Sequence, residues 1–489
     1  MKGFRAAIPA LATLLLSGTA SFVSAQQTFV LAETYPRSQA ANVVFLAEGY
    51  TESQFGAFRT DAASFRDAFL ADPSLAAYAN YFNFYGIFSV SADSGATADN
   101  IDNDAHCIDG TPRAQRNTAW GASFCGTGYK RLLFVADENE VESYVRQRVP
   151  EADLIVVVVN TDSYGGAGNG VVAVADRAHP NIIVHESGHA FAGLADEYDD
   201  DVPGYNTRIS ANITSNGTRE TVHWNHWIED STPVPTPDVD AWRNVVGVFE
   251  GAGYRSTGWY RPKHTCRMRS NNADFCEVCA ETWVLKLYRK ASPLVSASPE
   301  SGTAVSAKPG EAVRLSVDTR VPSENSRTVR VQWEVDGRVL SGVSGREFSR
   351  VLDAGSHVVR ALVQDTTPLV RKDAEGLLRD EASWTVLVGA DGISDGGPAD
   401  GRPANLAAEL AVGEVTRRGA RLAIPRSGLH RVELFGADGR RIGDLGWHDF
   451  PAGAHFLQWP GSGLPSGNVL VRVTRASDRA SVEKRVAVE

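Results

Sequence analysis

The residues His185, Glu186 and His189 form an H-E-x-x-H sequence, whose residue types suit metal-assisted hydrolysis. Apolar residues 182–184 precede it, and no strong helix breaker occurs before Gly193. On a helix, the two histidines lie one turn apart on the same face, so their imidazoles can bind one Zn²⁺. Glu186 then stands beside the metal, where its carboxylate can accept a proton from a zinc-activated water molecule. So short a motif also occurs by chance in structural helices, and other residues must support this interpretation.

A catalytic zinc ion needs a third protein ligand and one open position. Gly193 lets the chain leave the helix, and Asp196 follows three residues later, where it can return toward the metal. Glu197 is the rival ligand, and the spacing from Gly193 favours Asp196. We therefore predict that Asp196 and the two histidines bind one catalytic Zn²⁺, and that Glu186 is the general base.

The motif is similar to that of the metzincins, zinc proteases with the pattern H-E-x-x-H-x-x-G-x-x-H or D and a methionine turn under the metal. Here Gly193 and Asp196 each fall one residue later, so the turn after the helix must differ. The single internal methionine, Met268, lies downstream within residues 266–269. We expect Met268 to pack beneath the metal and to take no part in the reaction.

Residues 185–198 resemble the H-E-[FS]-G-H-[SA]-F-x-G-L-A-D-E-Y pattern of the IgA metallopeptidase family, which are secreted bacterial zinc endopeptidases. Further similar stretches are residues 47–51, 81–83, 249–254, 260–262, 266–269 and 275–276. The resemblance covers the first three fifths of the chain. It implies a metzincin-like fold, a zinc ion and endopeptidase activity. It leaves the protein substrate open, including whether immunoglobulin is cleaved.

Residues 27–290 alternate strand and helix patterns, which indicates an α/β (α+β) domain. Residues 42–46 and 154–159 are apolar runs typical of buried strands. The glycine-rich residues 165–170 predict a flexible turn, because they lack the Lys and Ser/Thr ending of a phosphate loop. By analogy with metzincins, we expect residues 171–175 to be the edge strand that pairs with extended peptide substrate.

Residues 1–25 are predicted to be a secretory signal peptide. Lys2 and Arg5 provide the positive start, residues 6–16 a short apolar run, and residues 23–25 a small-residue cleavage site. No later stretch of the sequence is long enough to span a bilayer. We therefore expect an exported, extracellular protein with no membrane span.

The rest of the chain is predicted to form four parts. Residues 26–291 form the metzincin-like zinc metallopeptidase domain, and residues 292–390 an immunoglobulin-like β-sandwich, because apolar and polar residues alternate along their strands. Residues 391–405, rich in Gly, Asp and Pro, form a linker. Residues 406–489 form a second β-sandwich that loosely resembles bacterial C-terminal sorting domains. That likeness implies contact with secretion machinery or the cell surface, and a plain spacer or adhesion module is the alternative.

All five cysteines lie in the predicted peptidase domain. In an exported protein we expect disulfides, with Cys107–Cys125 and Cys266–Cys276 as the favoured pairs. One odd thiol remains, and this pairing assigns it to Cys279. Cys276-x-x-Cys279 could also be half of a structural zinc site, but no second half is evident in the sequence, so we favour the disulfide.

The formal net charge of −11 and the absence of a basic run argue against a nucleic-acid partner. The acidic residues 196–201 leave a Ca²⁺ site open as an alternative to a solvated loop. Tyr198 and Tyr260 are both candidates for hydrogen bonding to the transition state, and the sequence does not choose between them.

These features predict a secreted zinc-dependent endopeptidase that acts on protein or peptide substrate. The alternatives are a surface-binding adhesion protein without catalysis, and a peptidoglycan amidase. The intact glutamate beside two histidine ligands argues against the adhesion protein. The amidase would be favoured by a protein that solubilised cell walls but left unfolded proteins untouched.

Overall fold

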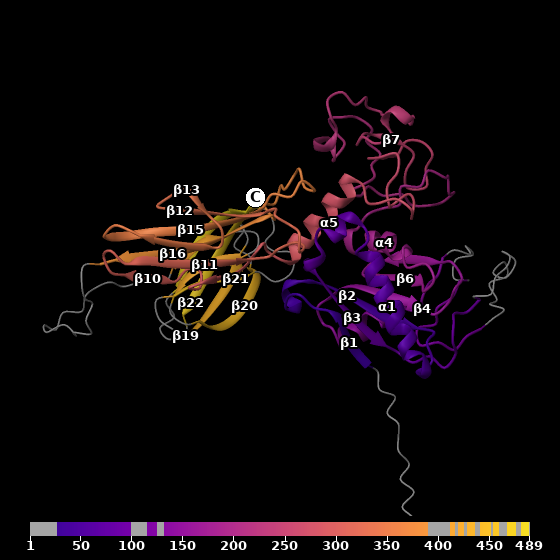
Figure 1. The fold of residues 1–489 in the computed structure, drawn as a ribbon, viewed down its shortest axis with the longest axis horizontal. Helices are drawn as coiled ribbons and strands as arrows, with labels where there is room; N and C mark the ends of the chain where they lie inside the picture. The colour runs from indigo at the N-terminus through magenta and orange to yellow at the C-terminus, as the bar shows by residue number, and fades with distance from the viewer. Residues whose placement is uncertain are drawn as a thin grey trace, which may run out of the picture. The chain divides into compact units, whose positions relative to one another are not determined.

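The computed structural model describes residues 27–98, 115–124 and 132–389, together with the strands between residues 411 and 488. The chain divides into two compact units, Met1–Lys286 and Leu287–Glu489 (Figure 1). The predicted signal peptide, the predicted Cys107–Cys125 pair and the predicted linker lie outside the described residues. Within those residues, no helix is both long enough and apolar enough to cross a membrane.

The first unit is built on a six-stranded sheet in the order β1-β3-β2-β4-β6-β5. Its strands are β1 (Gln27–Ala32), β2 (Ala41–Glu48), β3 (Phe82–Phe88), β4 (Ala152–Val159), β5 (Gly166–Asn169) and β6 (Val172–Asp176). The four central strands run parallel, whereas β1 and β5 run antiparallel at the two edges. Parallel strands need cover on both faces, which explains why β2 and β4 are almost continuously apolar.

Helices cover both faces of this sheet. Helix α1 (Phe55–Phe69) packs its buried phenylalanines on one face, where Phe65 meets Phe45 of β2 with ring centres 6.3 Å apart. Helix α3 (Glu138–Arg146) buries Val141 and Val145 on the other face, beside Val44 of β2. Successive residues of β2 therefore face opposite layers, as expected of a strand with period two.

The remaining elements of this unit are short, except for its last helix. They are η1 (Arg37–Gln39), η2 (Glu52–Gln54), α2 (Pro73–Ala76), η3 (Ala79–Tyr81), α4 (Ile182–Ser187), η5 (Gly188–Ala192), η6 (Asn225–Trp227), η7 (Asp240–Trp242), β7 (Phe249–Glu250), β8 (Tyr260–Arg261) and α5 (Glu277–Lys290). Trp283 of α5 is buried against Phe69 of α1 and Phe82 of β3, with ring centres 5.8 and 6.4 Å away. Through this aromatic contact, the last helix of the unit packs against elements from its first half.

The glycine-rich segment is strand β5, so two sequence predictions are wrong. Residues 171–175 are not the edge strand, because β6 lies inside the sheet between β4 and β5. Residues 165–170 are not simply a turn, because Gly166–Asn169 pairs antiparallel with β6. A Cβ atom on Gly166 would lie 2.5 Å from Cγ2 of Ile182 in α4. Glycine therefore allows the edge strand to approach the helix. From its composition alone, the glycine-rich segment is predicted to be a flexible turn.

The second unit begins with two packed sheets, of order β10-β16-β15-β12-β13 and β14-β11-β9. Their strands are β9 (Leu294–Ser298), β10 (Ala304–Ala307), β11 (Ala312–Thr319), β12 (Val329–Val335), β13 (Arg338–Ser344), β14 (Glu347–Val351), β15 (Gly355–Asp365) and β16 (Arg379–Val388). Trp333 of β12 is fully buried and stacks on Trp384 of β16, with ring centres 5.7 Å apart. The inner faces of the two sheets supply this core.

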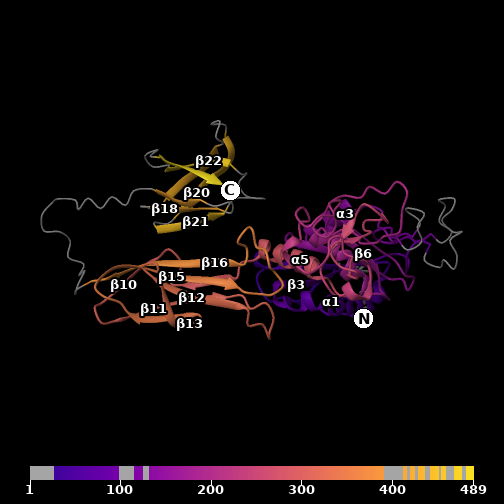
Figure 2. The same cartoon turned by 90° about the horizontal axis from the view of Figure 1, so that it is seen from above.

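The remaining strands form two further sheets, of order β17-β18-β21 and β20-β19-β22-β23 (Figure 2). They are β17 (Ala411–Val415), β18 (Gly419–Ile424), β19 (Gly428–Phe435), β20 (Arg441–Phe450), β21 (Gly453–Gln458), β22 (Gly467–Arg475) and β23 (Ser481–Val488). Val432 of β19 and Val471 of β22 are fully buried. After the last residues of α5, the described part of the second unit contains β-strands without helices, so the chain as a whole is a sheet-rich α+β protein.

Trp333→Ala should lower the stability of the β9–β16 sandwich by about 3–5 kcal/mol, because it leaves a cavity between Trp384 and Phe348. Scanning calorimetry of the full chain measures the shift of the corresponding unfolding transition. Val339→Ala in the same sheet is the control, since Val339 is 54 % exposed and should shift nothing measurable. Equal unfolding of both variants would contradict this account of the core.

Candidate metal centre

The helix that carries the two histidines widens in its second half. Residues Gly188–Ala192 form a π-helix, in which the backbone takes in one more residue per turn than an α-helix. The amide of Leu194 donates to the carbonyl of Gly188 at 2.9 Å, and Gly193 ends the helix in the left-handed conformation at φ 70°. The π-helix accommodates one additional residue at the place where Gly193 and Asp196 come one position later than in the metzincin pattern.

The structure brings His185, His189 and Asp196 together. The two Nε2 atoms are 3.1 Å apart, and Oδ1 of Asp196 lies 3.1 Å from Nε2 of His185 and 3.4 Å from that of His189. Nitrogen and oxygen ligands at 2.0–2.1 Å from a tetrahedral ion are separated by about 3.3 Å. The three atoms therefore have the spacing of one face of such a coordination shell.

Backbone carbonyls hold both imidazoles in this orientation. Nδ1 of His185 donates to the carbonyl of Arg267 at 2.9 Å, and Nδ1 of His189 donates to that of Leu194 at 2.7 Å. Because a carbonyl only accepts, both Nδ1 atoms carry hydrogen and both Nε2 atoms point at the shared centre. Such outer contacts are typical of metal-ligating histidines, since they fix the tautomer and the ring plane.

The electrostatics of Asp196 and His189 favour positive charge at this centre. Burial works to raise the pKa of Asp196, but hydrogen bonds with the two histidines hold that pKa well below its usual range. Burial works to lower the pKa of His189, but the carboxylate of Asp196 raises it to about 9. The centre thus keeps an anionic carboxylate in a site shielded from water, and a positive charge stabilises it there.

Glu186 lies between the metal centre and the edge strand β5. A Cβ atom on Gly168 would come within 3.0 Å of Oε2 of Glu186, and one on Gly166 within 3.4 Å of Oε1. The carboxylate also acts electrostatically on His189. The two glycines therefore give the glutamate room against the strand, on the side where the histidines converge.

Met268 lies directly against the helix at Gly188. Its side chain is fully buried, and its Sδ would be 2.6 Å from a Cβ atom on Gly188. Its carbonyl accepts a hydrogen bond from the amide of Glu197 at 2.8 Å. Met268 therefore supports the helix between the two histidine positions, and its backbone holds the segment that carries Asp196.

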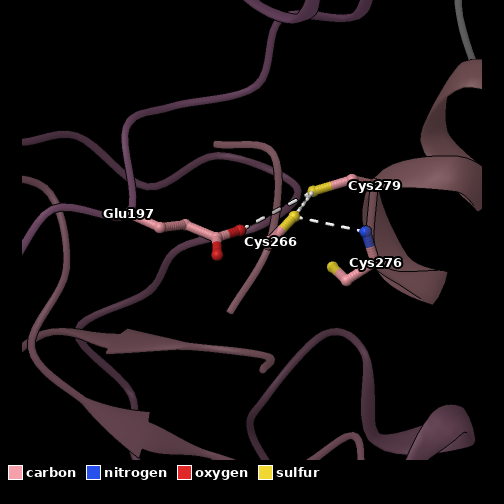
Figure 3. Close-up of side chains that lie close together, drawn as sticks. All are labelled: Glu197, Cys266, Cys276 and Cys279. Atoms are coloured by element: carbon pink, nitrogen blue, oxygen red, sulfur yellow. Dashed lines mark hydrogen bonds between the residues drawn. The ribbon is translucent and has the colours of Figure 1, made fainter. Parts of the chain in front are cut away.

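Glu197 faces away from the two histidines, so the structure does not bring this rival ligand to the first centre. Successive residues of an extended segment point to opposite sides. Glu197 is fully buried among three thiols, those of Cys266, Cys276 and Cys279, and the ligand atoms of all four residues lie within 4.8 Å of one another (Figure 3). The sequence analysis considered only Cys276-x-x-Cys279 as half of a zinc site and found no second half, because Glu197 is far from the cysteines in the chain.

The expected Cys266–Cys276 disulfide is absent, because all three cysteines of this cluster are free thiols in the structure. Burial raises the pKa of Cys266 and that of Cys279, and it also raises the pKa of Glu197. Burial acts the same way on Cys276, but hydrogen bonds from the other two thiols lower its pKa to about 6. The cluster therefore brings one carboxyl group and three thiols together where solvent water does not reach them.

Among the candidate tyrosines, Tyr198 lies beside the centre, with its ring stacked on His185 at 6.0 Å. Tyr260 belongs to β8, and its ring fills the space over Gly217. Tyr205, which the sequence did not single out, is 42 % exposed. Burial and then the charge of Asp196 raise the pKa of Tyr205, so its hydroxyl lies within electrostatic reach of the centre.

The acidic residues Asp199 and Asp201 that follow Asp196 have different hydrogen-bond and ion-pair partners. Asp199 forms a 2.7 Å ion pair with Arg269, and Asp201 accepts hydrogen bonds from the amide and the hydroxyl of Ser256. These two carboxylates therefore do not converge on a shared point, and the contacts described here give no support to the Ca²⁺ alternative.

Gly188→Ala should destabilise the first unit by about 1–3 kcal/mol, because the new methyl group overlaps Sδ of Met268. Thermal unfolding measures the loss. Gly56→Ala is the matched control: Gly56 lies on α1 with no atom within 4 Å of an added Cβ, so alanine should stabilise it slightly. The cost of Gly188→Ala should shrink in a Met268→Ala background, and an unchanged cost there would contradict this contact.

Comparisons with known proteins bear on the first unit and on the β-strands separately. The sequence model of the family described as IgA Peptidase M64 matches residues 29–243 and 238–285. No curated protein matches the chain. Fibronectin(III)-like modules of CbhA from Clostridium thermocellum are 17 % identical over 20 % of this chain and 96 % of theirs, with a TM-score of 0.14.

Titin Ig tandem domains are 13 % identical over 39 % of this chain and 93 % of theirs, with a TM-score of 0.13. TM-scores this low support no conclusion about a shared fold. The family match is of another kind, because it spans residues 29–285 and includes both histidines, Glu186 and the cysteine cluster. Those residues are more than half of the 489 in the sequence. The chain therefore belongs to the IgA peptidase M64 family, a family of metallopeptidases.

Proposed function

We propose that this protein is a secreted, zinc-dependent endopeptidase with a metzincin-like catalytic domain. The observation that carries the proposal is the convergence of His185, His189 and Asp196 at 3.1–3.4 Å, with the carboxylate of Glu186 beside them. Two imidazoles and one carboxylate are a donor set that zinc accepts while keeping a fourth position open. The family match supports peptidase activity, and residues 1–25 support export.

When bound, zinc supplies Lewis acidity that polarises a peptide carbonyl and makes water a nucleophile near neutral pH. Glu186 accepts the proton of the attacking water and delivers it to the leaving amine. The contact of Gly166 and Gly168 of β5 with this carboxylate supports the proposal that Glu186 acts on the side of the centre where substrate binds. Tyr205, which is 42 % exposed, and Tyr198, which stacks on His185, are the candidates whose hydroxyls would donate a hydrogen bond to the reacting carbonyl.

The edge strand β5 offers a backbone for extended substrate at Gly168. The carbonyl of Gly166 points away from β6 and accepts a hydrogen bond from the amide of Leu133 at 3.5 Å, so residues 132–133 already pair with that end of the outer edge. Residues two apart on a strand present their backbone groups to the same side, so the amide and carbonyl of Gly168 also point outward. A peptide that pairs there as an added strand runs past Glu186.

Glu186→Gln should abolish nearly all peptide hydrolysis, with a loss on the order of 10²–10⁴-fold, because glutamine cannot accept the proton. Its zinc content should equal that of the parent, since Glu186 is not a ligand in this proposal. Metal analysis and cleavage of a denatured protein, measured side by side on the full chain, test both parts.

Retained turnover in Glu186→Gln would refute the assigned base. Zinc in both proteins with cleavage by neither would favour a binding protein. Release of cell-wall fragments without cleavage of denatured protein would favour an amidase. Absence of zinc from both the parent and Glu186→Gln would refute the proposed metal site.

Gly168→Ala should lower kcat on the order of 10²-fold while zinc content stays constant, because the added methyl lies 2.7 Å from the carbonyl oxygen of Glu186 and displaces its carboxylate. Gly56→Ala, on the exposed side of α1, is the matched glycine control and should keep full activity. Steady-state kinetics on a peptide substrate measure the difference. Parent-like kcat in Gly168→Ala would mean that β5 does not position Glu186.

A further inference from the structure

We propose that Glu197, Cys266, Cys276 and Cys279 form a second metal site, a closed structural zinc site separate from the catalytic centre. The four side chains come from three segments, of which the one with Glu197 is distant in sequence from the other two, and they meet in the interior of the first unit (Figure 3). Each is at least 96 % buried, with exposed fractions of 0, 0, 4 and 0 %.

The distances inside the cluster fit a tetrahedral ion. Sγ of Cys266 lies 3.6 Å from Sγ of Cys279, which in turn lies 3.6 Å from Oε1 of Glu197. Zinc–sulfur bonds of 2.3 Å and zinc–oxygen bonds of about 2.1 Å place two sulfurs about 3.8 Å apart, and sulfur and oxygen about 3.6 Å apart. The side chains are thus already spaced as ligands of one ion.

The carboxylate of Glu197 points to a ligand that protein groups do not supply. Its Oε1 accepts from the side-chain amide of Asn212 at 2.9 Å and faces the Cys279 thiol. Its Oε2 is buried without a hydrogen-bond partner among the described residues. Leaving a buried acceptor unsatisfied costs about 1–3 kcal/mol, and thiols are weak donors. A bound cation attracts the carboxylate, and its binding releases the thiol protons to solvent, which leaves thiolate ligands.

A disulfide explains the cluster less well. Three cysteines cannot all pair, and a bond between any two leaves the third thiol and Glu197 buried together. The two Sγ atoms of Cys266 and Cys279 lie 3.6 Å apart, far from the ~2.05 Å of a disulfide. Metal binding uses all four groups at once.

The local backbone is also arranged for thiolate ligands. Cys276 directly precedes helix α5, and Cys279 lies in its first turn, so the amides and dipole at that end favour negative charge. The amide of Cys276 donates to Sγ of Cys266 at 3.2 Å. Four protein ligands with three sulfurs select zinc over calcium or magnesium, and they leave no open position for a reaction.

An ion in the second site would fix two chain segments that position the catalytic centre. Glu197 follows the ligand Asp196, and its amide is bonded to the carbonyl of Met268. Cys266 precedes Arg267, whose carbonyl orients His185. One ion would therefore fix both the segment that supplies the third catalytic ligand and the loop that supports the helix.

The test is metal analysis of the purified full chain. The parent should hold two zinc ions, a variant with His185→Ala and His189→Ala should keep one, and a variant with Cys276→Ser and Cys279→Ser should lose the second. A histidine variant that holds no zinc would overturn the proposal. Because the histidine variant keeps the cysteines intact, this result remains decisive even where the cysteine variant does not fold.

Cobalt identifies which site is filled. Co²⁺ alone, added to the zinc-free histidine variant, should give the near-ultraviolet charge-transfer absorption of thiolate ligands, which a site of histidine and carboxylate cannot produce. Absence of that absorption would overturn the second site while leaving the catalytic proposal intact. The reverse failure, thiolate absorption but no peptide cleavage by the parent, would overturn the catalytic proposal alone.

Alkylation without reduction, in denaturant with a chelator, separates metal from disulfide. Peptide mapping of the parent should find Cys266, Cys276 and Cys279 all alkylated. A cross-linked Cys266–Cys279 peptide would overturn the metal site and show that a disulfide holds these segments.

Discussion

The metal centre depends on how closely two segments, strand β5 and the loop with Met268, approach one helix. Gly166 and Gly168 let the edge strand β5 come within contact distance of Ile182 and Glu186, and Gly188 lets Met268 lie against the helix from the other side. Side chains at these positions would push the strand or the methionine outward. The absence of a Cβ atom at three places is therefore what holds the histidines, the glutamate and the strand in one compact arrangement.

The dipeptide Asp196–Glu197 distributes charge between two compartments. Extended backbone sends the first carboxylate toward the histidines and the second toward the cysteines. Both carboxylates lie where water cannot fully solvate them. Protein groups or a bound cation must therefore offset the free energy of burying each charge. The histidines do so for Asp196, while Glu197 has one amide donor and an unsatisfied oxygen. A shift of one residue in this segment would exchange the two carboxylates.

The helical spacing of His185 and His189 could be predicted from the sequence, because a local period decides which side chains share a face. The choice of Asp196 over Glu197 also followed from local geometry. The only sign of the π-helix in the sequence was that Gly193 and Asp196 fall one residue later than in the metzincin pattern. Strand β5 could not be recognised, because glycine favours turns unless a tertiary contact requires it, and that contact is with a helix that comes later in the chain. The cysteine cluster was missed for the same reason, since its fourth member is a glutamate from a remote segment.

The hydrogen bond from His185 to Arg267 joins residues 82 positions apart, whereas the three ligand residues lie within a short stretch. A growing chain that has passed Asp196 already contains every proposed catalytic ligand. It still lacks the carbonyl that sets the tautomer of His185 and the methionine beneath the helix. Closing that long loop carries an entropic cost that later packing must offset. Maturation of the centre is therefore a late event in synthesis, and a nascent chain released before the loop closes has the ligands but no rigid site to present them.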